Sequence, residues 1–200
     1  MKILFVACLP KGPGFGENLA NKLRGSLVEA GHSVEWHELY SEGFGPLLDA
    51  AELARGMSFD SLVLTHARAL VEAEGLVILH PDWWGQPPAI LKGWVDRVLR
   101  EGVAYELVGE DGFEKEWRPL LGGKKAFVLV SSDSADPARS GLFRSIWVDA
   151  TLGACGMKAE CHVFANMRRS SAEKRREWME EMVGSAARLF MADEPWTRRG

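Results

Sequence analysis

Three nearly continuous apolar runs of seven residues constrain the fold of this chain more than any other feature. They read KILFVAC at 2–8, GLVILHP at 75–81 and KAFVLVS at 125–131. Runs of this length, rich in β-branched and aromatic residues, are typical of strands buried on both faces of a parallel sheet. Because parallel neighbours need long crossover connections, the runs also predict helices between them.

Amphipathic segments fill the gaps between these runs. Leu19, Leu23 and Leu27 recur at helical spacing, and Gly31 follows as a helix stop. The alternating sequence SVEWHEL indicates a further strand. The full prediction is strands at 2–8, 33–39, 75–81, 125–131 and 157–164, helices at 17–30, 61–73, 89–100, 142–155 and 171–191, an irregular or briefly helical segment at 40–60 and a polar loop at 105–123.

This alternation predicts an α/β protein with one domain over residues 1–200. Its expected form is a flavodoxin-like three-layer sandwich, with a five-stranded parallel sheet in the order 2-1-3-4-5 and helices on both faces. A length of 200 residues suits a single full-sized core, and no linker or repeat divides the chain. In such sheets ligands bind beyond the carboxyl ends of the strands, at the switch point between strands 1 and 3.

Composition argues against several classes of function. The net charge is −4, so no strong nucleic-acid field is expected, and no apolar run is long enough to span a bilayer. The three cysteines, Cys8, Cys155 and Cys161, form no CxxC pair. This odd count indicates reduced thiols in a cytoplasmic protein and argues against a disulfide framework or a zinc site. No metal site is therefore predicted.

Three loops are expected to meet at the ligand-binding edge. The loop after 2–8 is rich in glycine and opens onto a helix N-terminus, which attracts phosphate, although an ordinary turn explains the same spacing equally well. The loop after 75–81 holds adjacent tryptophans between stiff prolines, so its N–H groups can bond the edge of a flat heterocycle. The loop after 125–131 carries short polar side chains, which also suit a helix-capping turn.

These loops supply the candidate cofactor-binding residues. The candidates are Lys11, Gly14, Phe15, Gly16 and Asn18 in the first loop, Pro81, Asp82, Trp83, Trp84 and Gly85 in the second, and Ser131, Ser132 and Asp133 in the third. Of the histidines only His80 lies near the predicted cleft. It is not a candidate, because a buried histidine ahead of a proline is more often structural.

The second loop and the segment after it resemble a known family. PDWWGQPPAILKGWVDRVL is similar to the signature P-x-x-W-x-x-x-P-A-x-L-K-G-W-x-[DE]-R-V of the flavodoxin-like NAD(P)H:quinone oxidoreductases, which include DT-diaphorase and bacterial modulators of drug activity. Upstream, HELYSEGFGPLL resembles the D-L-Y…F-x-P segment of the same family. The matching signature residues are Pro81, Trp84, Pro88, Ala89, Leu91, Lys92, Gly93, Trp94, Asp96, Arg97 and Val98.

The resemblance implies an enzyme that binds FMN or FAD in the three loops and reduces quinones with NAD(P)H. FMN is favoured slightly, because no separate segment suits an adenosine half. It also implies a homodimer, and Phe113 and Trp117 in the charged loop 109–118 are candidate contacts. Trp84 is expected to line the flavin cleft, and Trp83 to point toward the substrate mouth or the partner subunit.

Departures from the family pattern keep a second hypothesis open. Gly14 and Gly16 stand where the family has hydroxyl residues, and SSDS replaces the family sequence T-T-G-G, so that Asp133 adds a negative charge. No Tyr or His occurs between Val108 and Cys161, so no catalytic side chain is predicted. The alternative is therefore a flavodoxin-like regulatory or interaction subunit with weak or lost flavin binding.

Overall fold

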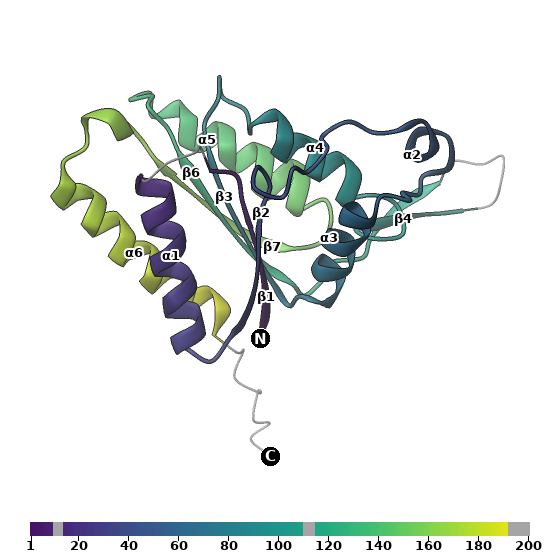
Figure 1. Ribbon diagram of the computed structural model, residues 1–200, viewed down its shortest axis with the longest axis horizontal. Coiled ribbons are helices and arrows are strands. Elements are labelled where there is room, and N and C mark those ends of the chain that lie inside the picture. The colour runs from purple at the N-terminus through teal and green to yellow at the C-terminus, as the bar shows by residue number, and fades with distance from the viewer. Residues whose placement is uncertain (10–13, 110–114, 192–200) are drawn as a thin grey trace, which may run out of the picture.

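A computed structural model describes residues 1–9, 14–109 and 115–191, and its centre is a parallel sheet of five strands (Figure 1). The strand order is β2-β1-β3-β6-β7, which is the predicted 2-1-3-4-5 order, so the predicted fold class is confirmed. All four ladders are parallel. The strands are β1 (Lys2–Ala7), β2 (Ser33–Glu38), β3 (Gly75–Pro81), β6 (Lys125–Ser131) and β7 (Lys158–Phe164).

Helices cover both faces of the sheet (Figure 1). Alternate residues of the central strands feed two cores, so that Ile3 and Phe5 pack on one side while Leu4 and Val6 pack on the other. None of the helices in the described part of the chain has the length and apolar character needed to cross a bilayer. The first face carries α1 (Phe15–Glu29) and α6 (Ala172–Phe190), and the second carries α3 (Ser61–Glu72), α4 (Ala89–Val98) and α5 (Ala138–Arg144).

Capping side chains define the starts of α2 (Ala50–Arg55), α3 and α6. Asp60 accepts hydrogen bonds from the first turn of α3, and Ser171 does the same for α6. The short helix α2 begins with a capping box formed by Asp49 and Glu52. At α1 the N-cap is Gly14, which has no side chain to cap the helix. Among the described residues, no side chain therefore caps the N–H groups of the first turn of α1 at the ligand-binding edge of the sheet.

Two segments differ from the prediction. The polar loop expected at 105–123 contains an antiparallel hairpin of β4 (Tyr105–Val108) and β5 (Glu116–Pro119). Its register is supported by Tyr105 and Trp117, whose rings stack with centroids 3.6 Å apart. The Trp117 indole also donates to the Ala154 carbonyl, so this side chain packs on its own chain, while Phe113 lies outside the described residues.

The single helix expected at 142–155 is two elements. The helix α5 begins earlier, at Ala138, and a π-helix, η1 (Ser145–Leu152), continues it. At its end a Cβ on Gly153 would stand 2.2 Å from the Val148 carbonyl oxygen, so the wide helix requires glycine there. The π-helix changes the helical period, which is why α-helical spacing placed the element imperfectly.

Candidate functional site

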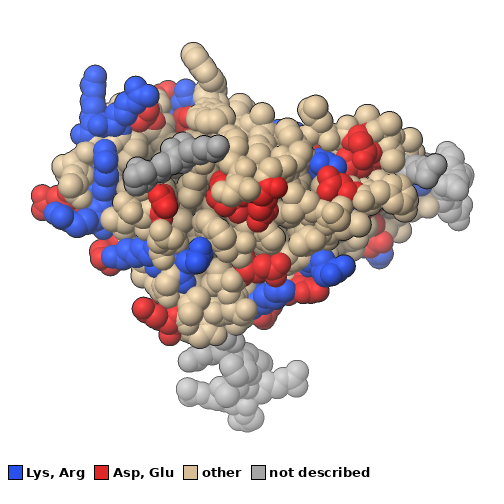
Figure 2. Space-filling view, viewed as in Figure 1, with Lys and Arg blue, Asp and Glu red and all other residues tan. Residues whose placement is uncertain are grey.

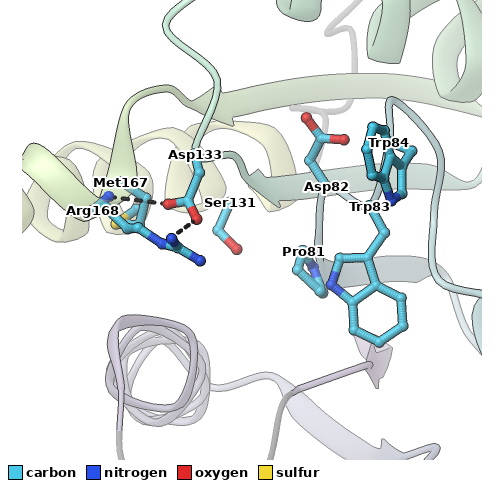
Figure 3. Close-up of a pocket in the computed structure, with 8 residues that line it drawn as sticks. All are labelled: Pro81, Asp82, Trp83, Trp84, Ser131, Asp133, Met167 and Arg168. Carbon is cyan, nitrogen blue, oxygen red and sulfur yellow. Dashed lines mark hydrogen bonds and ion pairs between the residues drawn. The ribbon is translucent and has the colours of Figure 1, made fainter.

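A cavity of about 780 Å³ opens beyond the carboxyl ends of β3 and β6 (Figure 3). The predicted loops after these two strands do meet there, since Pro81 pairs with Ser131 in the sheet register. The connection after β7 completes the wall. The lining residues are Pro81, Asp82, Trp83, Trp84, Ser131, Asp133, Met167 and Arg168.

Hydrogen bonds to Asp82 hold the loop after β3 in place. Its backbone N–H donates to the Ser131 carbonyl (2.7 Å), and its carboxylate accepts from Gly85 N–H (2.6 Å) and from the Ser132 hydroxyl (2.6 Å). Arg139 lies 3.7 Å from the same carboxylate. Ser132 is itself buried. Asp82 and Ser132, both predicted to contact cofactor, therefore join the two loops, and the Asp82 carboxylate is occupied by bonds within the protein.

The two tryptophans belong to a tight turn that projects them outward. Trp83 and Gln86 exchange two backbone hydrogen bonds of 3.0 and 3.1 Å, and the central residues Trp84 and Gly85 both have positive φ, of 59° and 79°. These features define a type I′ turn. Trp83 is 47% exposed and Trp84 98% exposed, and their rings point away from each other (Figure 3). Neither ring therefore caps the core.

The backbone favours glycine at position 85 of this turn, and a larger residue would also displace the end of the Arg139 side chain. Its φ of 79° lies in the left-handed region that favours glycine, and a Cβ there would stand 2.2 Å from an Arg139 nitrogen. Trp84 occupies the same region of φ without that freedom, which costs about 1–3 kcal/mol for a side chain of this kind. The turn thus holds a large aromatic residue in a strained backbone beside the cavity.

Two backbone N–H groups on opposite sides of the cavity are free to bind a ligand. Within the described part of the chain, neither Trp84 N–H nor Asp133 N–H has a hydrogen-bond partner. The neighbouring N–H groups of Asp82, Trp83 and Gly85 are all occupied. Both belong to residues that line the cavity, so each is available to an acceptor atom of a ligand bound there.

The negative charge of Asp133 is matched within the site. Its carboxylate accepts from the Arg168 backbone N–H (3.1 Å) and pairs with the Arg168 guanidinium (2.8 Å) (Figure 3). Both groups are largely exposed, so the pair contributes little to stability. It does mean that Asp133 does not present an unpaired carboxylate to the cavity, which was the concern raised by the SSDS sequence.

A second, smaller cavity of about 360 Å³ lies between the first turns of α1 and α6. It brings together Gly14, Phe15 and Asn18 from the first predicted loop with Arg175 and Arg176. Figure 2 shows Lys and Arg side chains gathered over the end of the molecule that holds the start of α6. Free helical N–H groups and two guanidinium groups together favour an anion.

Two further candidates, Gly16 of the first loop and Gly85 of the second, line neither cavity. Gly16 packs against Leu9, since a Cβ on it would stand 2.9 Å from that side chain. Gly85 sits behind the turn, against Arg139. Lys11 lies outside the described residues.

Sequence reasoning missed the connection after β7. Met167 and Arg168 line the larger cavity, and Arg175, which lines the smaller one, donates to the Met167 carbonyl (2.9 Å). The signal was present, because NMRRSS begins two residues after the end of the last predicted strand and so must lie at the same sheet edge as the other loops.

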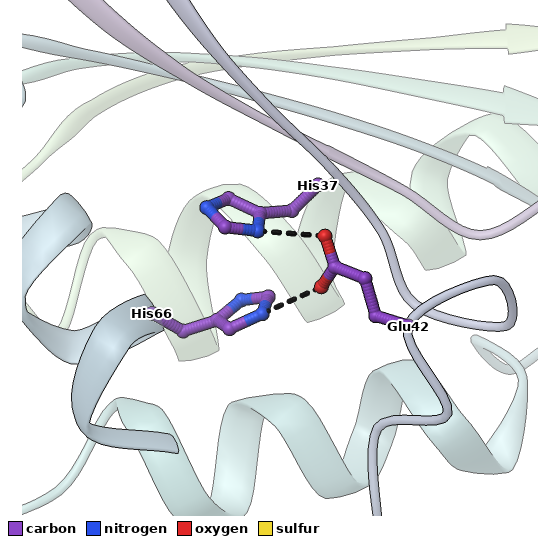
Figure 4. Close-up of side chains that lie close together, drawn as sticks. All are labelled: His37, Glu42 and His66. Carbon is purple, nitrogen blue, oxygen red and sulfur yellow. Dashed lines mark hydrogen bonds and ion pairs between the residues drawn. The ribbon is translucent and has the colours of Figure 1, made fainter. Parts of the chain in front are cut away.

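A separate cluster of His37, Glu42 and His66 has the donor types of a metal site (Figure 4). Each histidine bonds one oxygen of Glu42 at 2.8 Å. The Trp94 indole N–H also donates to Nδ1 of His66 (2.9 Å), so the proton of the neutral ring is on Nε2, the nitrogen that faces Glu42. A protonated nitrogen cannot ligate a metal. The cluster instead ties the segment after β2 to α3 and α4.

Comparisons with known proteins agree with this architecture. A protein family described as having a flavodoxin-like fold matches residues 1–187. An uncharacterized NAD(P)H oxidoreductase of Haemophilus influenzae is 35% identical over 95 residues, so the match spans about half of either chain, 46% of each. The FMN-dependent NAD(P)H:quinone oxidoreductase 1 of Pseudomonas aeruginosa is 37% identical over 62 residues, 31% of this chain and 29% of that one.

Among solved structures, the NAD(P)H:quinone oxidoreductase from Methanothermobacter marburgensis has a TM-score of 0.80 and 23% sequence identity. The superposition covers 96% of this chain and 98% of that one. At this identity the likeness shows a shared fold, and the two free N–H groups beside the cavity remain the local evidence for what this chain binds.

Proposed function

Because the chain belongs to the family with the flavodoxin-like fold, we propose that it is a flavin-dependent NAD(P)H oxidoreductase that reduces quinones or similar small electrophiles. One observation carries the proposal: a cavity of about 780 Å³ with the free N–H groups of Trp84 and Asp133 beside it. That volume is within the range of small-molecule and cofactor pockets. A flat conjugated ring with oxygen and nitrogen acceptors on its edge suits this arrangement.

The residues of the site divide the binding of such a cofactor between them. Trp84 and Asp133 would bond the ring edge through their backbone N–H groups, and Trp83, Trp84 and Met167 would provide apolar surface. A phosphate would lie at the first turn of α1. No hydroxyl side chain is available there to bond it, and the positive charges of Arg175 and Arg176 would attract it instead. When bound, the flavin supplies the hydride chemistry, and the protein supplies position and electrostatics.

FMN is the proposed cofactor, with FAD as the other form to be tested. The smaller cavity, of about 360 Å³, has room for a single phosphate, and this supports FMN. The adenosine half of FAD would extend from the same phosphate position, so the binding of FMN and FAD must be compared directly. NADH or NADPH is the proposed reductant.

Titration of the apo-protein with FMN and with FAD, followed by flavin fluorescence, tests cofactor binding. We expect the flavin fluorescence to be quenched at micromolar protein, with tighter binding of FMN than of FAD. The loaded protein should then oxidise one equivalent of NAD(P)H per flavin without an acceptor and turn over repeatedly when a quinone is added, with the parallel-line kinetics of a ping-pong cycle. Absence of quenching with both flavins would sink the enzyme hypothesis.

A specific observation favours the second candidate, a regulatory or interaction subunit. Gly14 leaves the start of α1 without any hydroxyl, and the strongly exposed Trp84 would suit protein recognition as well as ligand contact. The same titration separates the two, since this candidate requires weak or absent flavin binding.

We also propose a homodimer, supported by an apolar surface around α2. Leu47, Leu53, Met57 and Phe59 are all exposed there, and Phe59 is 65% exposed. Large apolar side chains that are exposed within one short segment are typical of protein interfaces. Light scattering at low concentration should give the mass of a dimer, and Phe59→Asp should shift it toward the monomer. A monomer mass for the unmodified protein contradicts this proposal.

A cytoplasmic location is proposed as well, and the free Cys8, Cys155 and Cys161 support it.

A further inference from the structure

A chain of hydrogen bonds runs from the π-helix η1 to the wall of the larger cavity. The Trp147 indole N–H donates to Nε2 of His80 (3.0 Å), and Nδ1 of His80 lies 2.7 Å from the Pro81 carbonyl oxygen. Trp147 and His80 are both buried. Because indole nitrogen can only donate, Nε2 must accept, and the proton of the neutral ring is on Nδ1, where it bonds the Pro81 carbonyl.

This tautomer fixes the peptide between Pro81 and Asp82. The carbonyl of that peptide accepts from His80, and its N–H donates to the Ser131 carbonyl (2.7 Å). With the other tautomer, a lone pair of Nδ1 would face the carbonyl oxygen at 2.7 Å, and the repulsion would turn the peptide. Asp82 also holds Gly85 N–H, so a turned peptide would move the whole turn that carries Trp84.

The element that carries Trp147 supports a functional reading of this chain of bonds. A π-helix of eight residues is rare, and such widened turns are frequent at functional sites. Here the wide geometry is reinforced by the Thr151 hydroxyl, which donates to the Ile146 carbonyl (2.6 Å). The widened turn places the indole directly behind His80, where their ring centroids are 5.5 Å apart.

We propose that Trp147 is a positioning residue for the cofactor site, acting through the tautomer of His80 to orient the Pro81–Asp82 peptide and the free Trp84 N–H. Trp147 does not line the cavity, so its effect is transmitted and not direct. This inference rests on the proposed function, because the ligand that Trp84 N–H would bind is the flavin edge.

The chain offers a matched control for the experiment. Trp94 is also fully buried, and its indole N–H also donates to a buried histidine, His66, but that histidine bonds Glu42 and not the cavity wall. Trp147→Phe and Trp94→Phe remove the same indole donor at comparable cost in packing. We expect Trp147→Phe to weaken FMN binding about tenfold, equivalent to about 1.4 kcal/mol, and Trp94→Phe to change it less than twofold.

Histidine nitrogen NMR on the flavin-free protein tests the first half of the inference independently. His80 should carry its proton on Nδ1 in the unmodified protein, and a mixture of tautomers should occur in Trp147→Phe. If that variant does not fold, β-(3-benzothienyl)alanine at position 147 keeps the indole shape and lacks the N–H.

The outcomes separate the inference from the proposed function. Equal FMN affinity in Trp147→Phe and the unmodified protein, or equal weakening by Trp94→Phe, overturns the positioning role. A proton on Nε2 of His80 in the unmodified protein overturns it as well. If the unmodified protein binds neither FMN nor FAD, the proposed function fails instead, even where NMR gives the expected tautomer.

Discussion

Gly93 of α4 lies so close to Pro46 that a Cβ at position 93 would stand 2.3 Å from the Pro46 Cα. The contact presses the segment after β2 onto α4. Arg97, one turn further along α4, donates to the Gly45 carbonyl (2.6 Å) and pairs with Glu52 and Asp60. Much of the K-G-W-x-[DE]-R-V signature therefore braces the fold beside the cavity and does not touch it.

Gly93→Ala should destabilise the protein by about 1–3 kcal/mol or more, because the added methyl meets backbone and not a flexible side chain. Urea unfolding measures the loss. Gly25→Ala is the matched control, since Gly25 lies inside α1 with no atom within 4 Å of the added Cβ, and it should gain about 0.5–1 kcal/mol. Equal effects at both positions would contradict the packing explanation.

The order of the sheet could be predicted because three buried strands can be recognised in the sequence as nearly continuous apolar runs. The hairpin of β4 and β5 could not, since its strands have four residues each and are largely exposed, and it is supported by the stacking of the Tyr105 and Trp117 rings from the two strands. The π-helix was hidden for a related reason, because its period is read as an imperfect α-helix.

At the site, sequence reasoning identified the loops better than the roles of single residues. Topology places Trp83, Trp84 and Asp133 at one edge, and the structure brings them to one cavity. That Asp82 and Ser132 bond each other depends on the distance between two loops, which no local pattern contains. The same holds for the pairing of Asp133 with Arg168.

Gly14→Ser should tighten FMN binding several-fold. The position is the N-cap of α1, its backbone is extended, and an added Cβ has no atom within 4 Å, so a hydroxyl fits there beside the free N–H groups. Fluorescence titration measures the change. Gly16→Ser is the control, because its Cβ would meet Leu9 at 2.9 Å, and it should weaken binding or stability. If Gly14→Ser leaves FMN affinity unchanged, the phosphate does not lie at this helix.

His80 should make the protein less stable in acid. Burial lowers the pKa of His80 from 6.5 to about 4. Between those values the unfolded chain binds a proton that the folded chain excludes, so the free energy of unfolding falls as pH drops, by about 1.4 kcal/mol per pH unit. The groups that face the ring are the Trp147 indole, Phe143, the Pro81 carbonyl and the charge of Asp82.

His80→Gln removes this titration, so its loss of stability between pH 7.5 and pH 5 should be about 2 kcal/mol smaller than that of the unmodified protein. Burial also lowers the pKa of His66, and that contribution remains in both proteins. Urea unfolding at the two pH values gives the difference. Parallel pH dependence of the two proteins would show that His80 is not the group responsible.

Trp84→Asn should separate stability from cofactor binding. Trp84 has φ of 59° and is 98% exposed, so its replacement loses almost no buried surface. Asn tolerates this region, and Asn followed by Gly85 is a preferred type I′ pair, so the variant should gain about 1 kcal/mol of stability. If the ring packs on the flavin, the lost aromatic contact of about 0.5–1.5 kcal/mol should weaken FMN binding up to about tenfold.

Trp83→Ala is the control: Trp83 does not share the positive φ, so its loss should give no gain in stability and should mainly raise the KM for the quinone. Urea unfolding and FMN titration of both variants decide the matter, and a Trp84→Asn protein that is more stable and binds FMN unchanged would show that the strained tryptophan serves something other than the flavin.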